Sequence, residues 1–178
     1  KKPVEKETFP RVVESALENG SGPEALYAAL DLGTNSCRML IAQPKGAQFH
    51  VIDSFAKSVQ LGAGLEKTGR LSRDSMNRTI QALKVCKQKL DKYDVKYSRL
   101  IATEACRRAK NSKDFILKVF QETGLKLNII DTEEEARLAV ISCAPLVSSK
   151  SEQLLVVDIG GGSTELVWID LSSVPSHE

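Results

Sequence analysis

The 178-residue chain carries 25 Lys and Arg against 23 Asp and Glu, with 42% hydrophobic and 27% charged residues. This composition is typical of a folded globular protein and lacks the strong basic excess of a nucleic-acid-binding domain. No apolar run is long enough to cross a bilayer, so we expect no membrane partner. The cysteines stand singly, without a C-x-x-C pair or a histidine cluster, which argues against a zinc site or a disulfide framework.

The beginning of the chain predicts a tail and linker over residues 1–24. It starts with Lys1 and not with Met, so we expect a fragment or a processed form. The glycine-rich sequence NGSGP at 19–23 is typical of a linker. The first residues are too acidic for a transit peptide and lack the apolar core of a signal peptide. We therefore expect a cytoplasmic location, or an organelle if a targeting segment has been removed upstream.

Apolar runs bounded by Gly and Pro predict strands, and apolar residues at helical spacing predict helices. The expected strands cover residues 26–32, 37–43, 49–56, 100–103 and 125–131, followed by one strand on each side of a glycine turn at 160–162. The expected helices begin after the capping residues Ser72, Ser112 and Thr132 and end near residues 90, 124 and 143. A loop with two glycines, residues 60–65, is expected close to the end of the first strand.

Near the end of the chain, the sequence LLVVDIGGGSTELVW predicts a strand, a tight turn and a second strand. Glycines let a ligand approach the main chain closely, and successive backbone N–H groups in such a turn form an anion site. Ser163 and Thr164 add hydroxyl donors, while Asp158 and Glu165 place carboxylates beside the anion. Carboxylates next to a phosphate require an intervening cation, which suggests Mg²⁺ held partly by substrate phosphates. The alternative is a glycine-rich hairpin without a ligand.

The same pattern occurs earlier as ALDLGTNSCRMLI. Aligned with the later sequence, Asp31 falls on Asp158 and Ser36 falls on Ser163, with apolar runs flanking both turns. Two copies of one strand–turn–strand pattern favour a repeated binding element over two chance hairpins.

The sequences DLGTNSCRML and DIGGGSTELV together resemble the Ppx/GppA family of exopolyphosphatases and guanosine pentaphosphate phosphohydrolases, within the actin-like superfamily. The resemblance covers about 26–170, and one departure is Thr34, where the family usually has Ser. It implies an α/β fold: a ribonuclease-H-like domain over 25–145, with a mixed five-stranded sheet flanked by helices. Residues 146–178 would begin a second such domain with its opening hairpin.

The resemblance also implies roles for individual residues. Glu135, in the sequence EEEAR, would be the general base that acts on water, and Arg107, in a T-x-x-x-R pattern, would bind phosphate. Asp158 and Glu165 would hold Mg²⁺, with Asp31 as a further candidate. The full set of expected phosphate-binding residues is Thr34, Asn35, Ser36, Arg38, Arg107, Gly160, Gly161, Gly162, Ser163 and Thr164.

Local sequence leaves alternatives to these roles open. Thr132 and Glu135 have the spacing of a capping box, in which the Glu bonds back to the first N–H of the helix. Arg38 could point to phosphate or to solvent, and Arg108, Glu133 and Glu134 are expected on the surface.

The expected function is hydrolysis of terminal phosphoanhydride bonds in inorganic polyphosphate or guanosine pentaphosphate. Two alternatives are a non-catalytic phosphate or nucleotide sensor on the same fold and a kinase-like phosphotransferase. No specific nucleic-acid partner is expected, and a homodimer is left open.

Overall fold

In a computed structural model, residues 25–46, 48–143, 146–148 and 151–171 can be described. The predicted tail and linker at 1–24 lies outside these residues. The elements in chain order are β1 (Tyr27–Leu32), β2 (Ser36–Lys45), β3 (Gln48–Ser58), α2 (Leu65–Thr68), α3 (Arg73–Lys92), β4 (Tyr97–Ala102), α4 (Glu104–Arg108), α5 (Ser112–Thr123), β5 (Asn128–Ile129), α6 (Thr132–Cys143), β6 (Gln153–Ile159) and β7 (Thr164–Asp170).

The first five strands form one sheet in the order β3-β2-β1-β4-β5. Strands β1, β2 and β3 are antiparallel neighbours, whereas β4 runs parallel to β1 and β5 runs parallel to β4. The expected mixed five-stranded sheet flanked by helices is therefore confirmed. Strands β6 and β7 form a separate antiparallel hairpin, as the repeated glycine motif predicted.

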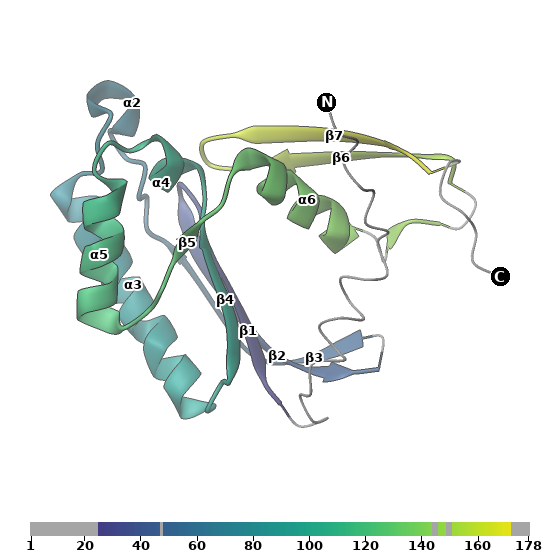
Figure 1. Cartoon of the computed structure of the whole chain (residues 1–178), viewed down its shortest axis with the longest axis horizontal. Helices are drawn as coiled ribbons and strands as arrows, with labels where there is room; N and C mark the ends of the chain where they lie inside the picture. Colours follow the sequence, from purple (N-terminus) through teal and green to yellow (C-terminus); the bar gives the residue numbers. More distant parts are fainter. Residues whose placement is uncertain (1–24, 47, 144–145, 149–150, 172–178) are drawn as a thin grey trace, which may run out of the picture.

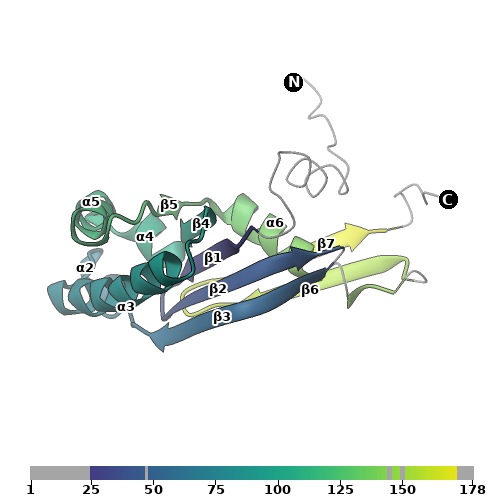
Figure 2. The same ribbon diagram turned by 90° about the horizontal axis from the view of Figure 1, so that it is seen from below.

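Helices α3 and α5 pack on one face of the sheet, and α6 lies between the sheet and the β6–β7 hairpin (Figure 1, Figure 2). Alternate residues of β1, among them Leu30 and Leu32, enter the core beside Leu83 of α3 and Phe115 of α5. The apolar run at 26–32 forms a strand as predicted, but Ala29 is exposed on the face opposite the core. Only one face of this strand is covered by α3 and α5.

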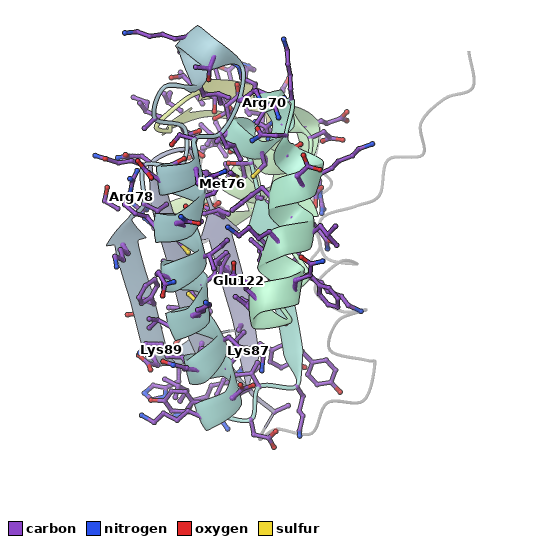
Figure 3. The ribbon with its side chains drawn as sticks, turned by 90° about the vertical axis from the view of Figure 1, so that its left-hand side faces the viewer. Arg70, Met76, Arg78, Lys87, Lys89 and Glu122 are labelled. Atoms are coloured by element: carbon purple, nitrogen blue, oxygen red, sulfur yellow. The ribbon has the colours of Figure 1, made fainter. Side chains whose placement is uncertain are left out.

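The outer face of α3 and α5 carries charged side chains, among them Lys87, Lys89 and Glu122 (Figure 3), and several of its lysines form ion pairs. Lys89 bonds to Asp53 of β3 at 2.6 Å, and Lys84 bonds to Glu122 of α5 at 2.8 Å. Within the described residues, no helix is long and apolar enough to cross a membrane.

Two helix starts test the capping predictions. Ser72 caps α3 as predicted, because its side-chain oxygen accepts a bond from the Ser75 amide at 3.1 Å. The prediction that Ser112 caps α5 is wrong: the cap position is Asn111, and Ser112 is already helical. The Asn111 amide is buried and bonds instead to the backbone N–H and C=O of Leu71, at 2.9 and 3.1 Å.

The segment after α5 is less regular than its sequence suggested. Gly124 ends α5 in the left-handed conformation (φ +73°), as expected for a helix stop. The predicted strand at 125–131 is reduced to β5, since only Asn128 and Ile129 pair with β4. The short helices α2 and α4 had no counterpart among the predicted elements.

Candidate functional site

Each of the two glycine turns is closed by an equivalent backbone hydrogen bond. The Gly33 amide donates to the Ser36 carbonyl, and the Gly160 amide donates to the Ser163 carbonyl, both at 2.9 Å. The residues that flank each turn also face each other across the strands, as Asp31 opposite Arg38 and Asp158 opposite Glu165. The repeat seen in the sequence is therefore a repeat of backbone geometry.

The two turns touch each other. A Cβ atom on Gly161 would lie 2.7 Å from the Cβ of Asn35, and one on Gly162 would lie 2.6 Å from the Oγ1 of Thr34. These distances are too short for any residue other than glycine at either position. The Thr34 hydroxyl oxygen is buried in this contact and has no hydrogen-bond partner among the described residues, so it can still donate or accept a bond at the site.

The loop with two glycines, which was predicted to lie near the first turn, forms hydrogen bonds to the backbone of that turn. The amides of Val59 and Gln60 both donate to the Asn35 carbonyl at 2.9 Å, and the Gly62 amide donates to the Thr34 carbonyl at 2.9 Å. Arg78 on α3 holds this loop in turn, with its Nε 3.2 Å from the Val59 carbonyl oxygen (Figure 3). The turn is thereby tied to the main helical layer.

A polar cavity of about 350 Å³ lies between the turns, at the carboxyl ends of β1 and β4. Its lining residues are Asp31, Gly33, Thr34, Asn35, Ser36, Arg38, Thr103, Glu104, Glu135, Asp158, Ile159, Gly160, Gly161, Gly162, Ser163 and Glu165. All of the predicted site residues except Arg107 and Thr164 line this cavity. Thr103 and Glu104 were not predicted to belong to the site, although Thr103 ends a predicted strand and Glu104 directly follows it.

The cavity is strongly acidic. Five carboxylates line it, whereas Arg38 is the single cationic side chain among its lining residues. Desolvation by the surrounding protein raises the pKa of Asp31, and the charges of Glu135 and Asp158 add to this effect while Arg38 opposes it. Cations that accompany an anion would offset its repulsion by these carboxylates.

Asp158 and Glu165 fit a magnesium site of limited protein coordination. They face each other across the β6–β7 hairpin, and Glu165 is only 7% exposed. No ion pair forms at either carboxylate within the described part of the chain, although like charges directly opposite each other are destabilising. No cluster of three His, Cys, Asp or Glu side chains forms a metal centre among those residues. Mg²⁺ commonly uses one or two carboxylates and completes its coordination with water and substrate phosphates.

Arg107 lies in a place that the sequence did not predict. Its side chain is 15% exposed, and its guanidinium donates to Glu135 Oε2 at 2.6 Å, to Glu104 Oε2 at 2.9 Å and to the Ile130 carbonyl at 3.1 Å. Desolvation lowers the pKa of Arg107, but its bonds to Glu135 and Glu104 outweigh this effect, so the pKa is raised. The expected phosphate ligand is therefore bonded to two carboxylates of the site.

The capping-box interpretation of Thr132 and Glu135 is wrong. Helix α6 begins at Thr132, and Asp131 caps it by accepting a bond from the Glu134 amide at 2.8 Å. The third helical residue is thus Glu134, and the Glu135 carboxylate is free to reach Arg107 and the cavity.

Glu134 is not a simple surface charge either. It accepts bonds from Arg137 at 2.7 Å and from Arg99 of β4 at 2.5 Å. These two bonds lower the pKa of Glu134 to about 2. Arg108 is paired with the exposed Glu66 at 2.6 Å, in agreement with its predicted surface location.

Comparison with known proteins identifies the family. Residues 40–177 match the Ppx/GppA phosphatase family, and the chain belongs to this family. The fold is similar to that of the Aquifex aeolicus Ppx/GppA family member, at 39% identity and a TM-score of 0.72 over 82% of this chain and 47% of that one. It is also similar to an exopolyphosphatase from Cytophaga hutchinsonii, at 27% identity and a TM-score of 0.77 over 82% and 46% of the two chains. The chain spans about half the length of these solved relatives.

Proposed function

We propose that this chain provides one wall and the phosphate turns of a phosphoanhydride hydrolase. The substrate would be inorganic polyphosphate or guanosine pentaphosphate, cleaved at its terminal phosphate. The observation that carries the proposal is the position of Glu135. This carboxylate lines the same cavity as both glycine turns, so a general base and a phosphate site face each other.

Backbone amides, hydroxyl groups and one arginine of the cavity would bind the terminal phosphate. The backbone amides of the two turns and the hydroxyls of Thr34, Ser36 and Ser163 donate to the terminal phosphate oxygens. Arg38 adds a fixed positive charge on the opposite strand from Asp31. Such positioning and electrostatic stabilisation account for most of the catalysis in phosphoryl transfer.

Glu135 has one oxygen available for water. Its Oε2 atom is bonded to Arg107, and its Oε1 atom has no partner among the described residues. Oε1 can therefore accept a proton from a water molecule directed at the terminal phosphorus. Water activation by a fixed carboxylate favours hydrolysis over a sensing role.

Asp158 and Glu165 are the proposed protein ligands of Mg²⁺, and Asp31 is the third candidate. When bound, the ion would neutralise phosphate charge beside these carboxylates. A bound cation would also offset the repulsion between Asp158 and Glu165, which lie opposite each other across the hairpin.

The test is Glu135→Gln in the full-length protein, assayed for phosphate release from both substrates with Mg²⁺. Gln keeps the shape and one acceptor but cannot take a proton, so the rate should fall about a hundredfold to ten-thousandfold. The matched control is Glu133→Gln, an exposed residue of the same helix turn, which should retain its rate. Near-normal turnover in Glu135→Gln would refute the assignment of the base.

A further inference from the structure

Arg107 is the residue whose position differs most from its expected role. It lies on α4 and bonds to Glu104 of the same helix and to Glu135 of α6. Its carbonyl partner, Ile130, directly precedes the cap residue of α6. One guanidinium thus links the end of β4 to the start of the helix that carries the base. A planar fork with several donors is suited to this linkage, and a lysine would not reproduce it.

The charge around Arg107 argues against direct phosphate binding. Glu104 and Glu135 both bond to the Arg107 guanidinium, so its positive charge is already offset by carboxylates within this group of three side chains. Glu104 is also paired with Arg108, whose Nε lies 3.6 Å from Glu104 Oε1. All three are largely buried, with side-chain exposures of 15% for Arg107, 19% for Glu104 and 18% for Glu135. Three of the five N–H donors of Arg107 are used by Ile130, Glu135 and Glu104, and Arg107 itself does not line the cavity in which a phosphate would bind. Arg38 lines the cavity without such a partner among the described residues.

We propose that Arg107 is a positioning residue for Glu135, and that it acts through this carboxylate without contacting the phosphate. The bond at 2.6 Å holds Oε2 and thereby fixes the direction of Oε1 toward the cavity. Glu104 holds the other side of the guanidinium and limits its rotation. This inference rests on the proposed function, because it gives Arg107 a role only if Glu135 is the base.

The test is a double-mutant cycle in the full-length protein, with Arg107→Ala, Glu135→Gln and the double variant. Displacement of a reacting group by about 1 Å costs up to about a hundredfold, so kcat of Arg107→Ala should fall about tenfold to a hundredfold. KM should change by less than about threefold, because ground-state binding is not affected. The double variant should be no slower than Glu135→Gln alone, since Arg107 has no other route to the reaction.

A binding measurement gives a readout that is independent of turnover. The probe is inorganic tripolyphosphate with Mg²⁺, titrated calorimetrically into Glu135→Gln and into the double variant. We expect the two dissociation constants to agree within about threefold. Arg107→Lys should recover part of kcat, because it restores one of the bonds. Arg73→Ala, which removes an exposed arginine from the first turn of α3, should leave kcat and KM unchanged.

The outcomes separate the two proposals. A raised KM for Arg107→Ala, multiplicative losses in the cycle and weaker probe binding would show that Arg107 binds phosphate, while Glu135 would stand as the base. Normal turnover in Glu135→Gln would remove the proposed base and, with it, the role of Arg107.

Discussion

Removal of Arg38 is the most direct test of how the acidic cavity accepts an anion. Arg38 is the single cation among the lining residues, and five carboxylates surround the same space. A hydrogen bond to a charged group contributes about 1.5–3 kcal/mol, so Arg38→Ala should raise KM about tenfold to about 150-fold. Arg38→Lys keeps the charge but loses the planar fork of the guanidinium, so its KM should lie between those of the original protein and Arg38→Ala.

The assay is phosphate release by the full-length protein at saturating Mg²⁺, with KM and kcat determined separately. The control is Arg73→Ala, which removes an exposed arginine from the first turn of α3 and should leave KM unchanged. If KM of Arg38→Ala stayed within about twofold of the original value, the phosphate would not depend on this side chain. An equal rise in KM for Arg73→Ala would show that KM depends only on the overall charge of the protein.

Two further predictions concern stability. Gly162→Ala places a Cβ 2.6 Å from Thr34 Oγ1 and should cost about 1–3 kcal/mol of stability by overpacking, measured as a lower melting temperature. Adding Thr34→Ala to this variant should restore part of the lost stability. An unchanged melting temperature in Gly162→Ala would contradict the contact between the turns. Glu134 has its pKa lowered to about 2 from the usual 4.5, so its ion pairs stabilise the fold fully above the usual value and are lost as the pH falls through about 2. Because the pair is partly solvated, Glu134→Gln should cost about 1 kcal/mol or less at pH 7; urea unfolding should show this difference shrinking toward pH 2, and a constant difference would refute the role of the ion pairs.

The sequence was sufficient to predict those parts of the fold that depend on local patterns. The order of the strands and of the three longer helices, the Ser72 cap and the Gly124 stop each follow from residues close together in the chain. The Asn111 cap was missed because its preferred partner, Leu71, lies 40 residues away. Neighbouring candidates for a cap cannot be ranked without such a distant contact.

In the candidate site, too, features set by local sequence were predicted and features set by distant contacts were not. The repeated turns identified most of the lining residues, because each turn is set by its own short sequence. The partners of Arg107 could not be predicted, because Glu135 is 28 residues away and both residues had plausible separate roles. The cap of α6 was displaced by one residue, since Asp131 and Thr132 are both good capping residues and only the backbone decides between them.

The packing of Thr34 predicts which substitutions should occur together in related sequences. Its methyl carbon would lie 2.3 Å from a Cβ at position 62, whereas its hydroxyl oxygen blocks a Cβ at position 162. A sequence with serine at position 34 lacks the methyl group but keeps the hydroxyl. Such a sequence can therefore accept alanine at position 62 while position 162 stays glycine, so residue 62 should covary with residue 34 and residue 162 should not.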